Sequence, residues 1–193
     1  MKKITFILSF LLLSVAAFAQ NTWKADPFHS KLGFTVTHLG IADVPGHFDK
    51  YDVTITSTKP DFSDAVVELT AQVNSINTRV EPRDNHLKSA DFFDAEKYPQ
   101  LTFTADSFQN NGDEGKVTGD LTIKGVTRPV TLNVEFGGIV VDPYGQTKAG
   151  FTVDGKVNRK DFNLTWDAVT EAGQVVVSNE IKLHCEIQLV KQA

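Results

Sequence analysis

The sequence predicts an all-β fold with a short helical insertion, in which about eight antiparallel strands close into a barrel. Apolar and polar residues alternate with a period of two over most of the chain after residue 22. This alternation is typical of strands with one buried face, and short connections between the runs make neighbouring strands antiparallel. One charged segment breaks the pattern. A sandwich of two sheets is the competing all-β architecture.

Eight runs of alternating residues define the predicted strands. They cover residues 32–38, 51–55, 65–73, 101–105, 117–123, 130–136, 151–157 and 175–189. Turn-forming sequences separate them, among them Pro60-Asp61, Lys124-Gly125 and Pro143-Tyr144-Gly145. Eight antiparallel strands can close into a barrel without exposed edges. A barrel of that size is either filled by its own side chains or holds one small ligand.

A helical insertion is expected over residues 81–99, between the third and fourth predicted strands. This stretch is rich in charge, and Leu87, Phe92 and Phe93 recur there at helical spacing. Asp91 is the expected N-cap of a second short helix, which ends before Pro99.

The first 19 residues have the composition of a signal peptide. Lys2 and Lys3 precede an apolar run of about 15 residues, and Ala17-Phe18-Ala19 supplies the small residues that signal peptidase requires. The run is short for a membrane anchor, which needs about 20 residues. We therefore expect cleavage after Ala19, a periplasmic or secreted protein without an integral membrane span, and a single domain over residues 20–193.

Charge and cysteine content limit the partners. The formal net charge is −5 and no basic run occurs, which argues against binding to nucleic acid or to an anionic membrane surface. Cys185 is the only cysteine, so no disulfide forms within the chain. Its place in an alternating run favours a small buried hydrophobe over a reactive thiol or an intermolecular bridge. A homodimer is left open.

The sequence carries no motif for catalysis or metal binding. It lacks Gly-x-Ser-x-Gly, His-Glu-x-x-His and Cys-x-x-Cys, and its five histidines lie at least nine residues apart. We therefore expect no catalytic residues and no metal site. Two polar clusters, residues 83–91 and 159–161, are each either a solvated surface or the polar rim of a ligand cavity. In such a rim an arginine could bind a phosphate or a quinone-type oxygen.

Four sequence blocks resemble the YceI-like family of polyisoprenoid-binding proteins. They are Asp26-Pro27-Phe28-His29-Ser30 with Phe34-x-Val36-x-His38 and Gly46-x-Phe48; residues 83–94 (RDNHLKSADFFD) followed by Tyr98-Pro99; residues 119–127 (GDLTIKGVT); and Arg159-x-Asp161-Phe162 with Trp166. These blocks follow the order of the family over nearly the whole chain after residue 19. Asn163 departs from the pattern, since members often carry glycine there.

The resemblance implies an extended, lipocalin-like barrel that holds a long isoprenoid of polyprenyl or quinone type, as a non-catalytic carrier or sequestering protein. No cofactor is expected apart from this lipid. The implied contacts near the polar head or the entrance are His29, His38, Arg83, His86 and Arg159. The implied apolar wall consists of Phe34, Val36, Leu69, Leu87, Phe92, Phe93, Phe103, Leu121 and Trp166.

Two other functions stay open on the sequence. The fourteen phenylalanines are enough to fill a small barrel, which would then act as a protein-interaction or stress-response module. An enzyme built on Arg83 and His86 is the other alternative. An interior filled from end to end would exclude the carrier hypothesis.

Overall fold

The computed structural model describes residues 20–112 and 114–193. The expected signal peptide, residues 1–19, lies outside the described residues. In chain order the elements are β1 (Asn21–Ala25), β2 (Lys31–His38), β3 (Ala42–Phe48), β4 (Tyr51–Ser57), β5 (Val66–Gln72), the 3₁₀ turn η1 (Val73–Ser75), β6 (Ile76–Asn77), α1 (Glu81–Lys88), β7 (Gln100–Asn111), β8 (Glu114–Ile123), β9 (Val126–Val141), β10 (Thr147–Asn158), the 3₁₀ turn η2 (Arg159–Phe162) and β11 (Val177–Lys191). No helix among these is long and apolar enough to span a membrane.

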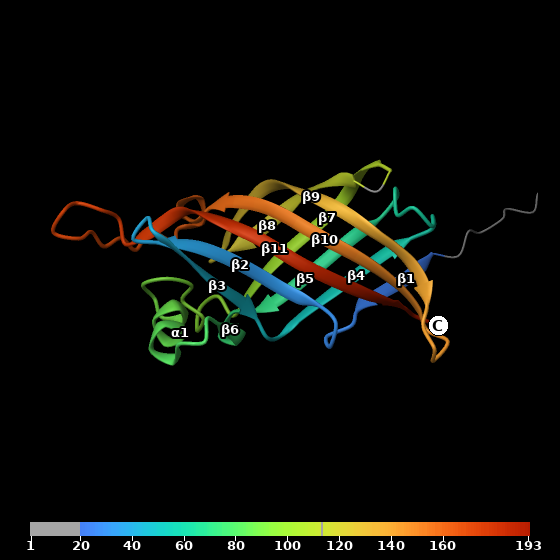
Figure 1. Cartoon of the computed structure of the whole chain (residues 1–193), viewed down its shortest axis with the longest axis horizontal. Helices are drawn as coiled ribbons and strands as arrows, with labels where there is room; N and C mark the ends of the chain where they lie inside the picture. Colours follow the sequence, from blue (N-terminus) through green and yellow to red (C-terminus); the bar gives the residue numbers. More distant parts are fainter. Residues whose placement is uncertain (1–19, 113) are drawn as a thin grey trace, which may run out of the picture.

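The strands close into an elongated antiparallel barrel (Figure 1). Its ring runs β1-β4-β5-β7-β8-β9-β10-β11, and β11 returns to β1 through the pairs Trp23–Lys191 and Ala25–Leu189. The first and last strands of the chain therefore form the closing seam. This confirms the predicted eight-stranded barrel and excludes the sandwich.

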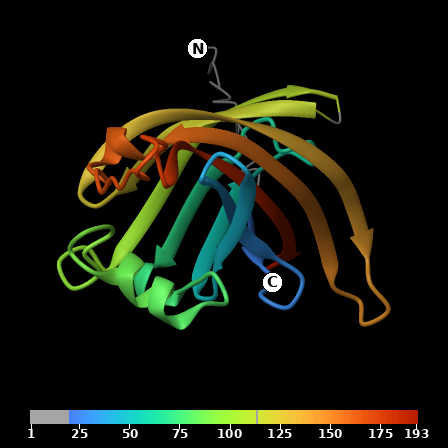
Figure 2. The same cartoon turned by 60° about the vertical axis from the view of Figure 1, so that its left-hand side comes forward.

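The barrel wall opens at one end, where β2, β3 and β6 extend from β11 beyond the ring. β11 pairs first with β2, as in Cys185–Leu32, and then with β1, so two short strands share one long partner. β6 pairs with β3 only at His47–Asn77 and Phe48–Ile76, and α1 follows directly. Figure 2 shows α1 and the turns after it at this open end. β1, β3 and β6 are not among the predicted strands.

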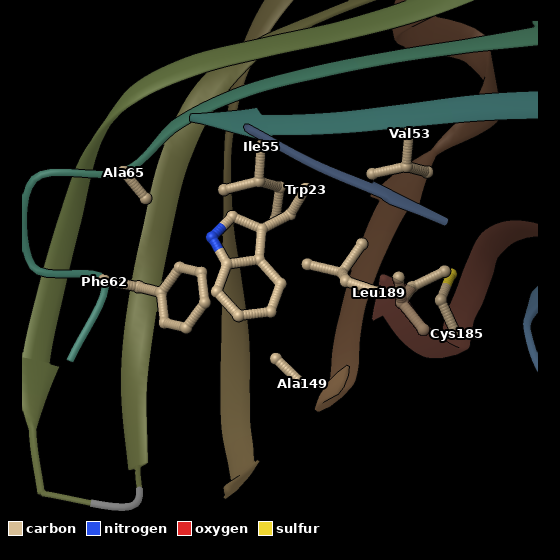
Figure 3. Packing of buried hydrophobic residues seen from close by; sticks show 9 residues of the cluster. Trp23, Val53, Ile55, Phe62, Ala65, Ala149, Cys185 and Leu189 are labelled. Carbon is tan, nitrogen blue, oxygen red and sulfur yellow. The ribbon is translucent and has the colours of Figure 1, made fainter. Parts of the chain in front are cut away.

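The opposite end of the barrel is packed with aromatic side chains. Phe62, from the loop between β4 and β5, has its ring centroid 5.3 Å from Trp23, 5.7 Å from Phe136 and 5.1 Å from Phe151. Figure 3 shows the Phe62 and Trp23 rings next to each other, with Ile55 beside Trp23. Burial of such rings is the largest apolar contribution that single side chains can make to a core of this size.

The helical insertion is confirmed as α1, but the predicted second helix is wrong. Residues 90–98 form turns, because Asp94 has a left-handed φ of 53°. The backbone N–H groups of Phe93 and Ala95 donate to the carbonyls of Leu87 and Lys88. These bonds use the free carbonyl groups at the C-terminal end of α1 and fold the segment back onto it. Asp91 is not an N-cap but hydrogen-bonds His86.

Candidate ligand-binding cavity

A cavity of about 440 Å³ lies inside the barrel. β2 to β5, β7 to β11, α1, η2, the loop between β4 and β5 and the segment after η2 contribute side chains to its wall. This volume lies in the range of small-molecule binding sites. The phenylalanines therefore do not fill the interior, and the filled barrel considered above is not the structure observed.

The nine residues predicted for the apolar wall all line this cavity. They come from β2, β5, β7 and β8, from α1 and the turns after it, and from the segment after η2: Phe34, Val36, Leu69, Leu87, Phe92, Phe93, Phe103, Leu121 and Trp166. Inward alternation along each strand gives the five strand residues among them their common direction. Their contact with a ligand remains a prediction.

Gly46 explains why Phe34 can lie flat on the cavity wall. The two residues face each other across β2 and β3, and a Cβ at Gly46 would lie 2.4 Å from Cζ of Phe34. Only glycine leaves room for the ring, which then packs 5.9 Å from Phe48. The Gly46-x-Phe48 block thus positions an aromatic part of the wall.

The polar side chains of the cavity wall gather at the α1 end. They are Thr37, His38, Thr78, Arg83, His86 and Arg159, while Cys185 lies further in. His38 is exposed and the His86 side chain is 42% exposed, so the cavity reaches the surface here. We refer to this end as the mouth. Its six residues give the cavity a polar opening and leave an apolar interior beyond them.

Arg83 is held in place at the mouth by Thr78. Its Nε donates to the Thr78 hydroxyl at 2.7 Å and its Nη2 to the Thr78 carbonyl at 2.8 Å. Buried Asp84 in turn accepts from the backbone N–H of Thr78 at 2.8 Å. Within the described residues no partner is found for Nη1 of Arg83. The guanidinium is therefore fixed in position with a donor group free for a ligand oxygen.

His86 joins α1 to the segment that follows η2. Its ring lies edge-on to Phe92, with centroids 5.0 Å apart, and to Trp166, at 5.4 Å. Nε2 of His86 is 3.0 Å from the carboxylate of Asp91. This aromatic group borders the mouth on two sides, so the position of Trp166 depends on the α1 insertion.

Arg159 lines the mouth, but its donors are taken up by the protein itself. The residue is 3% exposed. Its guanidinium donates to the carbonyls of Leu164, Trp166 and Ser178, and to the side chains of Asp167 and Asn179. These bonds give Arg159 a structural role, and its contact with a head group stays a prediction. It organises the chain reversal that begins at Asn163.

Asn163, the departure from the family pattern, sits in the left-handed conformation, with φ 58° and ψ 25°. Glycine adopts this conformation without cost, and asparagine tolerates it better than most residues. Asn163 can therefore form the same turn after η2 that a glycine would form at this position.

His29, which the resemblance also places near the head group, does not line the cavity. It lies between β1 and β2. Its Nδ1 is 2.9 Å from Asp26, which also pairs with Lys148 at 3.1 Å. Burial alone would raise the pKa of Asp26, but hydrogen bonds from Lys148 and His29 outweigh it and lower that pKa. The group ties β1 to β10.

Cys185 lies in the cavity wall and is buried. Its thiol is 3.8 Å from the Gly33 carbonyl. Burial raises the pKa of the thiol to about 11, so the group stays protonated at neutral pH.

Sequence reasoning named only some of the residues that line the cavity, and two that it missed, Phe62 and Thr78, shape its two ends. Phe62 stands alone in a turn sequence of Pro, Asp and Ser, and a single apolar residue in such a turn was the available signal. Thr78 carries no sequence signal, because its role depends on the contacts with Arg83 and Asp84 described above.

These features define a class of protein: a small antiparallel barrel that encloses an apolar cavity with a polar mouth. The family model of the YceI-like domain matches residues 23–189 of the chain. The chain is 38% identical to Protein YceI of Salmonella arizonae over 189 residues, which is 97% of this chain and 96% of that relative. It therefore belongs to the YceI-like family, as the sequence blocks predicted.

Solved structures share the same barrel. The Campylobacter jejuni YCEI protein is 34% identical, with a TM-score of 0.71 over 81% of this chain and 90% of that one. Two neighbours at lower identity share the fold. They are Burkholderia cenocepacia BcnA (22% identity, TM-score 0.72, 85% and 98% covered) and a polyisoprenoid-binding domain from Saccharophagus degradans (16%, 0.66, 88% and 98%).

Proposed function

We propose that the protein binds a long isoprenoid lipid of polyprenyl or quinone type, with the tail in the cavity and the polar head at the mouth. The observation that carries the proposal is the separation of polarity along the cavity. Its polar side chains gather around Arg83 and His86, and apolar side chains line the remainder apart from Cys185. A molecule with one polar end and a long apolar tail matches this arrangement.

The free energy available from an apolar cavity is sufficient for such binding. Each buried methylene contributes about 0.8 kcal/mol, so ten buried carbons give a gross gain of about 8 kcal/mol, or about micromolar affinity before the costs of association. A long isoprenoid has carbons to offset those costs. The free Nη1 group of Arg83 would donate to a phosphate or carbonyl oxygen of the head.

The proposed role is that of a carrier or sequestering protein without catalysis. The support for this role is the apolar lining of the cavity interior beyond the mouth, which offers a tail surface to pack against. The fold is shared with a domain described as polyisoprenoid-binding. With residues 1–19 as a cleaved signal peptide, the protein would act in the periplasm or outside the cell.

Mass spectrometry of lipid that co-purifies with the natively expressed protein tests the proposal. Phe34→Asp places a charge on the cavity wall, and we expect that folded variant to retain no apolar lipid. Thr35→Asp is the matched control, because Thr35 is the next residue of β2, does not line the cavity and faces Lys182 across β11. Unchanged lipid recovery from folded Phe34→Asp would contradict the proposal.

A further inference from the structure

Phe62 occupies the boundary between the cavity and the aromatic core at its closed end. Its side chain is 2% exposed and lines the cavity together with Ile55 and Ala65. Trp23 and Phe136 pack against the ring but do not line the cavity. The Phe62 ring is therefore the surface that the end of a chain entering from the mouth would meet.

The loop that carries Phe62 is fixed by Asp64. The carboxylate of Asp64 accepts hydrogen bonds from the Ser57 hydroxyl at 2.5 Å and from the Thr58 backbone N–H at 2.9 Å, and another from the Thr58 hydroxyl. Hydrogen bonds from the Ser57 and Thr58 hydroxyls hold the pKa of Asp64 well below its usual range. The loop is thus stapled to the end of β4 at neutral pH.

Phe62 itself has an unusual backbone conformation. Its φ is +56°, in the left-handed region, where a bulky residue is an outlier. Such a conformation persists only when the surroundings enforce it, here through the edge-on contacts of the ring with Phe136 and Phe151. The Phe62 ring is therefore fixed both by its contacts with neighbouring aromatic rings and by the loop that carries it.

We propose that Phe62 is a depth stop, which sets the longest isoprenoid tail that the cavity accepts. The inference rests on the proposed function, since it concerns the same cavity. A fixed aromatic ring at the closed end does not yield to a longer tail, so a longer molecule leaves isoprene units outside the mouth in water, where they lose the burial that they have in a micelle or a membrane. Retention then falls with chain length beyond a cut-off.

Two substitutions should move this cut-off in opposite directions. Phe62→Ala removes the phenyl ring from an apolar site, and apolar cavities of about 150 Å³ in proteins stay dry and bind a molecule the size of benzene. We expect the longest retained chain to grow by about one isoprene unit. Val67→Phe adds a ring to the wall close to Ile55, its partner in β4, and should shorten the longest chain.

The experiment offers delipidated full-length protein a mixture of linear polyprenols from farnesol to undecaprenol. Chromatography and mass spectrometry then measure the retained chains. The control is Phe28→Ala, which makes the same substitution at an exposed side chain that does not line the cavity and should keep the wild-type profile. If Phe62→Ala does not fold, Phe62→Leu and Val67→Phe decide the result.

A folded Phe62→Ala or Phe62→Leu variant with the wild-type chain-length profile would overturn the depth stop while leaving lipid binding intact. A Val67→Phe variant with the wild-type chain-length profile would also overturn the depth stop. If wild-type protein retains no polyprenol of any length, the proposed function fails and the depth stop with it.

Discussion

Replacement of Arg159 tests its assignment to structure and not to ligand binding. Arg159→Ala leaves the carbonyls of Leu164, Trp166 and Ser178 without their donor at a site that is 3% exposed in the native protein. Removing a buried charge from its hydrogen-bonded partners costs about 3–5 kcal/mol. The ion pair with Asp167 adds little to this, because that carboxylate is 44% exposed and screened by water.

The Arg159→Lys substitution should lower the free energy of unfolding by about 2 kcal/mol, since an ammonium group cannot reproduce the planar arrangement of five donors. Arg83→Ala is the matched control: Arg83 also lies at the mouth, but only Thr78 accepts its hydrogen bonds. We expect it to cost about 1 kcal/mol and to reduce lipid retention.

Urea denaturation of delipidated protein at pH 7 measures these free energies by linear extrapolation. Delipidation matters, because a bound ligand would add its own stabilisation. If Arg159→Ala loses less than about 1 kcal/mol, or no more than Arg83→Ala, the structural role given to Arg159 is refuted.

Two further predictions concern titrating groups. Because burial raises the pKa of Cys185 to about 11, alkylation in the folded protein at pH 8 should be at least roughly a hundredfold slower than that of an exposed cysteine. Val140→Cys in a Cys185→Ala background is the comparison, and equal rates would contradict the burial. The pKa of Asp64 is lower in the folded than in the unfolded chain, so its stabilisation is complete above about pH 5 and is lost as the pH falls through the folded value. Asp64→Asn should lower Tm at pH 7, and the Tm of the variant should fall less steeply than that of the wild type below about pH 4. An equally steep fall of Tm in the variant would contradict this role of Asp64.

The long strands were predictable because alternation requires only one buried face. β3 was not, because Pro45 and Gly46 interrupt its pattern. Pro45 is tolerated there because, in the described structure, β6 pairs with β3 only at His47 and Phe48. The missing N–H of Pro45 therefore leaves no ladder incomplete on that side.

The inward direction of the five strand residues of the apolar wall followed from alternation, whereas Leu87, Phe92, Phe93 and Trp166 were implied by the family resemblance alone. The polar residues at the mouth were not predictable from alternation, because an arginine binds a ligand only if its donors are free. Arg159 is taken up by carbonyls that the chain reversal at Asn163 brings to it. Arg83 keeps Nη1 available because Thr78 takes up only Nε and Nη2. The two arginines look alike in sequence and differ only in tertiary contacts.

The seam between β1 and β11 has a consequence for how the protein matures. The ring is complete only when residues 23–25 pair with residues 189–191. Pairing over such a sequence separation is intrinsically slow. Until then the interior faces water along its length. An apolar tail in the cavity would contact β4 and β11, the two strands that β1 joins when the ring closes, and would favour the closed ring by binding to it.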